Sequence, residues 1–119
     1  MNKVNIKFSK VALDFHFGLG FLGELLDSVE MGIDEVMQAI SKNPFRIIPI
    51  IMHSSASYSA KRNGLDFNYT VYDFIDFIDE SGGIAGVPVQ KFLNAFTNSM
   101  TKDVPKEVEA PKKKGLVKK

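Results

Sequence analysis

The hydrophobic pattern of the sequence changes its period at Leu19, and this change constrains the fold more than any other feature. Before Leu19, apolar residues alternate with polar ones on both sides of Ser9-Lys10. Such alternation is typical of half-buried β-strands. With Ser9-Lys10 as a two-residue turn, all six apolar side chains share one face, in the pairs Phe8–Val11, Ile6–Leu13 and Val4–Phe15. We therefore predict an N-terminal β-hairpin, although Ser-Lys is not a favoured turn dipeptide.

From Leu19 onward the apolar residues recur at helical spacing. A first stripe is formed by Phe21, Leu22, Leu25, Leu26 and Val29. Gly32 suits the C-terminal cap of this helix, and Asp34 is the predicted cap of a short helix that runs through Ile40.

The clearest helix start is Asn43-Pro44, which places an N-cap residue before a proline at the first helical position. We expect this helix to run to about Arg62 and to end at Asn63-Gly64. Pro49 lies inside it and should cause a kink, because proline has no backbone N–H to donate.

Two further helices complete the pattern. Thr70 and Asp73 resemble a capping box, and Gly82-Gly83 ends the helix that follows them. The last helix begins near Pro88 and carries an apolar face at Val89, Phe92, Leu93, Phe96 and Met100. The predicted fold class is α+β, mainly α, with an N-terminal β-hairpin followed by four to five helices.

Charge divides the 119 residues into two parts. Residues 1–100 have eight basic and eleven acidic side chains, whereas residues 101–119 have seven lysines and three acidic side chains. The second part contains Pro105 and Pro111 and shows no apolar period, so we predict a disordered, basic tail after one folded domain at residues 1–100.

The chain has no Cys, which excludes disulfides and thiolate metal sites. No apolar run is long enough for a membrane span, and no signal peptide is recognised at the N-terminus, so we expect an intracellular domain.

Few residues suggest catalysis or metal binding. His16 and His53 lie on different predicted elements, and neither has a second ligand at helical spacing. The serines after His53 lack the G-x-S-x-G motif of a nucleophile elbow, and small residues at these positions would let helices approach closely. We expect no enzyme, no cofactor and no metal site.

Two further patterns have both a functional and a structural interpretation. The acidic residues Asp73, Asp76 and Glu80 share one side of a helix, which fits a divalent-ion site or, as we favour, a solvated face. Gly18, Gly20 and Gly23 match G-x-G-x-x-G, but no second βαβ strand follows them. We interpret these glycines as a strand-to-helix turn.

The run Lys112-Lys113-Lys114 is the most distinctive part of the basic tail. It fits a solubilising tail and equally an arm that docks on an acidic partner, RNA or DNA.

Residues 15–26, Phe-His-Phe-Gly-Leu-Gly-Phe-Leu-Gly-Glu-Leu-Leu, resemble the start of the first helix in the tail assembly chaperones of long-tailed, siphovirus-type phages. The resemblance covers about residues 3–98. It includes the preceding β segment, the helix start at Asn43-Pro44, the helix that begins after Thr70 and the acidic-Gly end at residues 80–83. Gly23 and Pro49 depart from the family pattern.

This resemblance implies a chaperone without catalytic activity that binds the tape measure protein, keeps it soluble and promotes assembly of the tail tube around it. The implied place of action is the cytoplasm of the host cell, and the protein would be absent from the mature virion. The implied mechanism is reversible cover of apolar helical surface, with a helix seated in a groove. Ten Phe and five Met residues fit an exposed patch or self-association, and equally a well-filled core. For the partner-binding site we predict Phe92, Phe96 and Met100, together with the neighbouring Lys112, Lys113 and Lys114.

The implied partners are the tape measure protein, the tail tube protein and further copies of the chain. A longer form of the chain joins them if codons 112–115 contain a −1 frameshift site, as the Lys-Lys-Lys-Gly stretch allows. The alternative function is that of a small helical DNA-binding or regulatory protein that uses the basic tail. The net charge of −3 on residues 1–100 argues against it, and Lys61-Arg62 is the only basic pair on a predicted helix. We therefore expect no nucleic acid as a partner. A membrane is not expected either, because no apolar run is long enough to span one.

Overall fold

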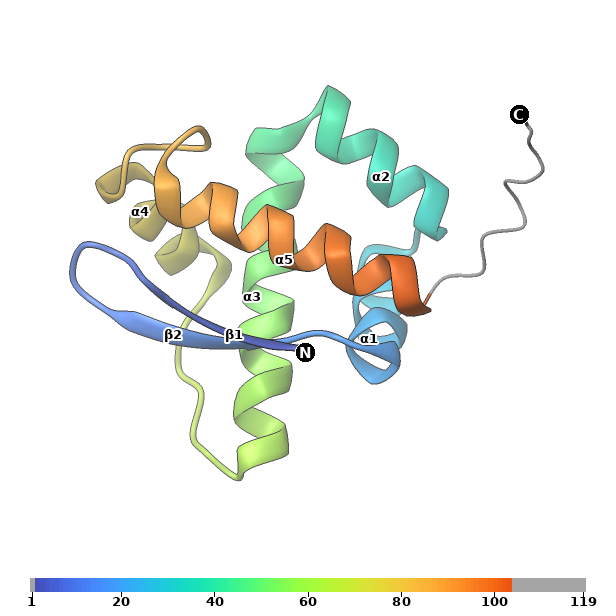
Figure 1. Cartoon of the computed structure of the whole chain (residues 1–119), viewed down its shortest axis with the longest axis horizontal. Coiled ribbons are helices and arrows are strands. Elements are labelled where there is room, and N and C mark those ends of the chain that lie inside the picture. Colours follow the sequence, from blue (N-terminus) through green and yellow to red (C-terminus); the bar gives the residue numbers. More distant parts are fainter. Residues whose placement is uncertain (1, 104–119) are drawn as a thin grey trace.

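The computed structural model describes residues 2–103, and every structural statement below concerns these residues. An antiparallel hairpin of β1 (Lys3–Lys7) and β2 (Ala12–His16) is followed by five helices. The helices are α1 (Leu19–Val29), α2 (Ile33–Lys42), α3 (Pro44–Asn63), α4 (Val71–Glu80) and α5 (Val87–Asp103) (Figure 1). The predicted fold class is therefore confirmed. The helix α5 extends three residues beyond the predicted end of the body, and the remainder of the predicted tail, with Lys112, Lys113 and Lys114, lies outside the described residues.

The hairpin has the predicted register. Val4 lies opposite Phe15 and Ile6 opposite Leu13, and the N–H of Phe8 donates to the carbonyl of Val11 at 2.7 Å. The polar face is joined across the strands by Asn5, whose Nδ2 donates to Oδ1 of Asp14 at 2.7 Å. The apolar face is therefore the one that packs against the helices.

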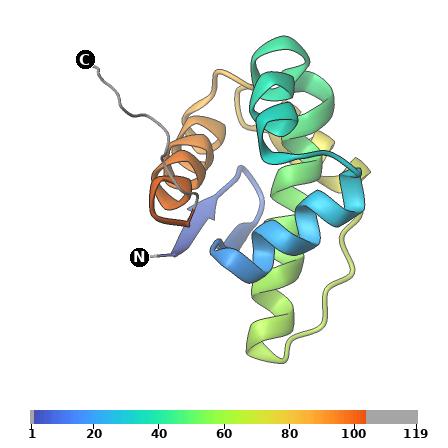
Figure 2. The same cartoon turned by 90° about the vertical axis from the view of Figure 1, so that its right-hand side faces the viewer.

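The hairpin lies between two helices. In Figure 2, α5 (orange) flanks one side of the dark blue hairpin and α3 (green) flanks the other. Contacts of β2 with α3 and of β1 with α5 agree with this arrangement. Figure 1 shows α3 as the central helix, which also contacts α1, α2 and α4.

Aromatic side chains from both ends of the described chain form the centre of the core. Phe15 lies 4.9 Å from Phe92 between ring centroids, and Phe17 lies 5.5 Å from Phe92 and 6.0 Å from Phe96. Phe21 is a further 6.0 Å neighbour of Phe96. All five rings are almost fully buried. The residues that resemble the chaperone motif thus pack directly against the apolar face of α5.

The boundary between α1 and α2 differs from the prediction. The left-handed residue that ends α1 is Glu30, with φ of 57°, and not Gly32. Gly32 instead precedes α2, where its N–H donates to Oε1 of Glu35 at 2.8 Å. Asp34 lies inside the first turn of α2 and is not its cap. The carboxylate of the third helical residue thus accepts from the N–H at the cap position, which is one half of a capping box.

The ends of α3 and α4 follow their sequence signals. Asn43-Pro44 begins α3, and Gly64 ends it with φ of 67°. The helix α3 continues past Pro49, which is buried; the kink expected there stays a prediction. At α4, Thr70 Oγ1 accepts from the N–H of Asp73 at 3.2 Å, and the N–H of Thr70 donates to Asp73 Oδ2 at 2.8 Å, which confirms the capping box.

Candidate functional site

The two histidines lie at separate places and serve different local contacts. His16 packs edge-on against Tyr58, with ring centroids 5.1 Å apart, and its carbonyl accepts a hydrogen bond from Ser55 Oγ at 3.1 Å. Its Nδ1 is buried and has no partner within residues 2–103. Burial, together with the positive charges of Lys3 and Arg62, lowers the pKa of His16 from its ordinary 6.5. These surroundings therefore favour the neutral form of the imidazole.

His53 is bound to the main chain of the connection before α4. Its Nε2 donates to the carbonyl of Tyr69 at 3.0 Å, and its ring lies edge-on to Phe67 and Phe74. Ser55 donates its hydroxyl hydrogen to the carbonyl of His16 in β2, whereas His53 donates to the carbonyl of Tyr69. The hydrogen bonds of the described chain therefore do not join a serine to His53 as a nucleophile and its base.

The acidic residues of α4 have separate roles. Asp73 caps the helix, and Glu80 pairs with Lys10 at 3.8 Å across an exposed surface. Asp76 and Asp79 are exposed. No cluster of three or more His, Asp or Glu side chains suited to a metal ion occurs within residues 2–103.

The glycines of the G-x-G-x-x-G match have structural roles. Gly18 adopts φ of 108° at the turn from β2 into α1, a conformation that favours glycine. Gly20 lies against Tyr58, and a Cβ atom placed on it would come within 2.9 Å of Tyr58 Cζ. The conformation of Gly18 and the close approach of Gly20 to Tyr58 agree with the interpretation as a strand-to-helix turn.

The basic pair of α3 is engaged with neighbours. Lys61 Nζ pairs with Oε1 of Glu24 at 3.0 Å, and the guanidinium of Arg62 lies 5.9 Å from the ring centre of Tyr58. Both side chains thus interact with neighbours in the fold, and the pair does not form an open basic face.

The residues predicted to bind a partner are not at the surface. Phe92 and Phe96 have no exposed side-chain area, and Met100 is 8% exposed. The expectation of an exposed apolar face on the last helix is wrong, because Phe15, Phe17 and Phe21 cover that face from the N-terminal side of the chain. Lys112, Lys113 and Lys114, predicted with them, lie outside the described residues.

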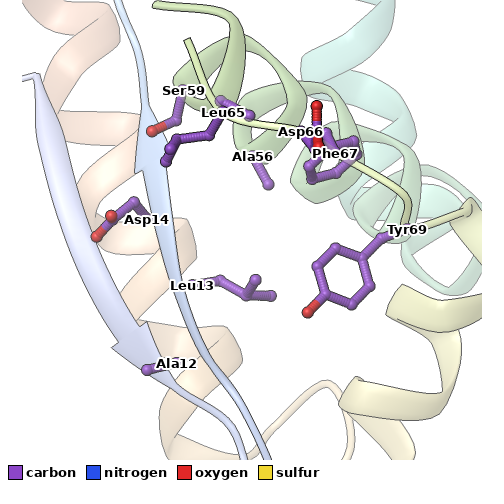
Figure 3. Close-up of a pocket in the computed structure, with 10 residues that line it drawn as sticks. Ala12, Leu13, Asp14, Ala56, Ser59, Leu65, Asp66, Phe67 and Tyr69 are labelled. Carbon is purple, nitrogen blue, oxygen red and sulfur yellow. The ribbon is translucent and has the colours of Figure 1, made fainter. Parts of the chain in front are cut away.

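A groove between β2, α3 and the connection that follows α3 is shown in Figure 3. It has a volume of about 170 Å³, and Leu13 and Tyr69 point toward one another across it. Asp14, Ser59 and Asp66 interrupt its apolar lining. Its lining is therefore mixed, although Leu65 is 62% exposed there.

A second groove lies between the start of α3 and α4, and its lining is almost entirely apolar. It has a volume of about 190 Å³ and is lined by Phe45, Pro49, Ile75, Ile78, Asp79, Gly83 and Ile84. Phe45 is 77% exposed and Ile75 is 37% exposed. Tyr72, which is 79% exposed, lies one turn before Ile75 on the same face of α4. We call Phe45, Tyr72, Ile75 and Ile84 the α3–α4 surface.

A third depression, of about 290 Å³, lies between α1, α2 and α3. Its apolar lining consists of half-buried or buried side chains, at Val29, Met31, Ala39, Ile47 and Ile50. Large, strongly exposed apolar side chains gather at the α3–α4 surface and not here. Large apolar side chains that are exposed together mark interaction sites on protein surfaces. The α3–α4 surface is therefore the candidate functional site.

Sequence reasoning missed this site because its residues look ordinary in isolation. Phe45 follows the helix-start proline, and Ile75 belongs to a helix whose neighbouring apolar residues Phe74 and Ile78 are buried. The available signal was Tyr72, which lies at i and i+3 spacing with Ile75 and so places two large apolar side chains on one side of α4, beside the acidic side of Asp73, Asp76 and Glu80.

Comparison with known proteins finds no matching family model, no matching curated protein and no matching solved structure. None of the helices within residues 2–103 combines the length and the hydropathy that crossing a bilayer requires.

Proposed function

We propose that this protein is a tail assembly chaperone of a long-tailed phage, which binds the tape measure protein through the α3–α4 surface. The observation that carries the proposal is a pair of aromatic side chains that remain more than three-quarters exposed: Phe45, which lines an apolar groove, and Tyr72, one helical turn before the groove residue Ile75. Their exposure is selective, because the phenylalanines of the hairpin, of α1 and of α5 are buried.

The resemblance at residues 15–26 supports the proposal through the fold. The aromatic and leucine positions Phe15, Phe17, Phe21, Leu22 and Leu25 are all buried. The resembling residues therefore build the scaffold that holds α3 and α4, and the binding surface lies elsewhere on the molecule. This separation is expected of a binding module, whose function depends on a surface held by a rigid frame.

Binding would occur by contact between apolar faces. A client helix with aliphatic residues at i, i+3, i+4 and i+7 would lay this stripe along Phe45, Ile75 and Tyr72, which removes both apolar faces from water. A groove of this size engages a short part of a long client, so each contact is small and reversible. Several copies bound along one tape measure protein would keep it soluble in the host cytoplasm until the tail tube protein assembles around it.

The test is to co-express the full chain with segments of the tape measure protein encoded beside it and to measure the soluble fraction of each segment. We expect the chain to raise the soluble yield of at least one helical segment, and Phe45→Ser and Tyr72→Ser to reduce that gain. Leu19→Ser is the matched control, because Leu19 is 75% exposed on α1 and lies outside the groove. The proposal is overturned if no segment gains solubility, or if Leu19→Ser lowers the gain as much as Phe45→Ser.

A further inference from the structure

The α3–α4 surface has an apolar centre that no part of residues 2–103 covers. Phe45 and Ile75 are exposed, and Ile84 is half-buried at the edge of the groove. Apolar side chains that are exposed together, rimmed by polar residues, mark surfaces at which proteins bind a partner or associate.

The border of this surface is acidic. Asp79 is the one ionisable residue that lines the groove, and Asp76 is exposed one turn earlier on α4. Glu80 does not line the groove and pairs with Lys10 of the hairpin turn at 3.8 Å, so the acidic border consists of Asp79 and Asp76. The groove is lined by no Lys or Arg. An occupant with an apolar centre and basic flanks would therefore match it in both respects.

The chain itself contains such a segment. Residues 112–119 read Lys-Lys-Lys-Gly-Leu-Val-Lys-Lys, so that Leu116-Val117 has three lysines before it and two after it. Apart from one glycine, every residue in this segment is either apolar or positively charged, which is the complement of the groove and its acidic border.

The geometry brings this segment within reach. Ile84 lines the groove, and α5 begins three residues later at Val87, so the groove lies beside the start of α5. In Figure 1, α5 runs from the side of α4 toward the opposite end of the molecule. Its 17 residues span about 25 Å. Residues 104–116 can extend over about 43 Å, and a flexible chain of this length has a mean span of about 20 Å.

We propose that Leu116-Val117 and the lysines around them dock on the α3–α4 surface of the same chain and shield it until a client displaces them. Because the mean span of the connecting residues is close to the distance to be covered, the effective concentration of the segment at the groove is in the millimolar range. An intrinsic dissociation constant of similar size then leaves the groove covered in a substantial fraction of molecules. Shielding of this kind keeps the apolar surface from self-association and remains weak enough for a long apolar client to replace it.

The docking itself is tested without any client. Backbone amide NMR spectra of the full chain would be compared with those of the double variant Leu116→Ser/Val117→Ser. Within residues 2–103, we expect shifts confined to residues 45, 72, 75, 79 and 84, with the thermal unfolding midpoint unchanged. Asp79→Lys should produce the same shifts at residues 45, 72, 75 and 84, and Asp27→Lys, which changes an exposed acidic residue on α1, should not. In about 1 M salt the spectra of the original chain and of the double variant should converge, because the ion pairs are screened.

Three results would overturn the proposal. The first is an absence of shifts in Leu116→Ser/Val117→Ser, and the second is an equal effect of Asp27→Lys. The third is a dependence of the shifts on protein concentration, which would assign the contact to the tail of a second copy and not to the same chain.

The role of the docked segment as a competitor rests on the proposed function and is measured separately. Leu116→Ser/Val117→Ser should bind a soluble tape measure peptide about two- to tenfold more tightly than the original chain, because the client no longer competes with the tail. Amide shifts without any client binding would leave the docking intact and refute the proposed function. Client binding with unchanged affinity in the variant would refute shielding and leave the proposed function intact.

Discussion

The hydroxyl group of Tyr58 on α3 occupies the space that a side chain on Gly20 of α1 would need. The ring of Tyr58 is held on its other sides, by the edge of His16 at 5.1 Å and by the guanidinium of Arg62 at 5.9 Å. It therefore cannot move away without disturbing the end of β2 and the last turn of α3. Gly20 lets α1 and α3 approach closely, and this contact gives the glycine-rich turn its structural purpose.

We predict that Gly20→Ala lowers the free energy of unfolding by about 1–2 kcal/mol, because the added methyl group overpacks the contact with Tyr58. Gly23→Ala is the matched control, since a Cβ atom on Gly23 meets nothing within 4 Å. It should stabilise α1 by about 0.5–1 kcal/mol, as expected for replacing glycine within a helix. Urea unfolding of both variants gives the comparison.

The double variant Gly20→Ala/Tyr58→Phe identifies the cause. Removing the hydroxyl group takes away the atom nearest to the new methyl group, so part of the lost stability should return. Equal destabilisation by Gly20→Ala in the presence and absence of the hydroxyl would refute the close contact as the reason.

The stability of the fold should decrease in mildly acidic solution because of His16. Burial and the charges of Lys3 and Arg62 lower the pKa of His16 in the folded state below 6.5, so the unfolded chain binds the proton first as the pH falls. The stabilising contribution is present above pH 6.5 and is lost as the pH falls from 6.5 through the lowered pKa. Urea midpoints measured between pH 5 and pH 8 test this dependence. His16→Phe keeps an aromatic edge against Tyr58 and should flatten the profile in this window; an unchanged slope would assign the dependence to other groups.

Substitutions in α5 and at the start of α3 should separate the core from the α3–α4 surface. Phe92→Ala removes a fully buried ring and should cost about 3–5 kcal/mol, enough to unfold a marginal domain. Phe45→Ala removes a ring that is 77% exposed and should change the unfolding free energy by no more than about 0.5 kcal/mol. Thermal unfolding followed by circular dichroism distinguishes the two. A large loss of stability in Phe45→Ala would mean that this residue supports the fold and is a poor candidate for client binding.

The parts of the fold that sequence analysis predicted are those encoded by neighbouring residues. The pairing of Ile6 with Leu13 follows from alternation across a short turn, and the capping box at Thr70 follows from a spacing of three residues. The start of α3 at Asn43-Pro44 has the same local origin. Gly32 shows the limit of such signals, because glycine suits both the end of one helix and the residue before the next.

The location of the candidate site could not be predicted in this way, because exposure depends on which faces meet in three dimensions. The apolar face with Phe92 and Phe96 has the periodicity of a binding face and equally of a core face. Its burial is decided by Phe15 and Phe17, which lie more than 70 residues earlier in the chain. The reverse holds for Phe45. It follows a strong helix-start signal, but no segment within residues 2–103 packs over most of its ring, so it stays exposed.

The caps of α3 and α4 offer a final comparison, because only one of them uses its side chain. Thr70 accepts a hydrogen bond from the N–H of Asp73, whereas the Asn43 side chain makes no capping hydrogen bond. Thr70→Ala should therefore lower the unfolding free energy by about 1 kcal/mol, and Asn43→Ala by less than half of that.

The two hydrogen bonds of the α4 cap are reciprocal, so Thr70→Ala and Asp73→Ala should not be additive. We expect the double variant to lose less stability than the sum of the single variants, by about 0.5 kcal/mol or more.

Because α4 presents Tyr72 and Ile75, loss of this cap should also weaken binding of the proposed client before the whole domain unfolds, since a frayed first turn displaces Tyr72. Hydrogen exchange at residues 72–75, measured beside the binding assay, would show both effects together. Additive losses, or unchanged exchange at these residues, would show that the cap does not control the α3–α4 surface.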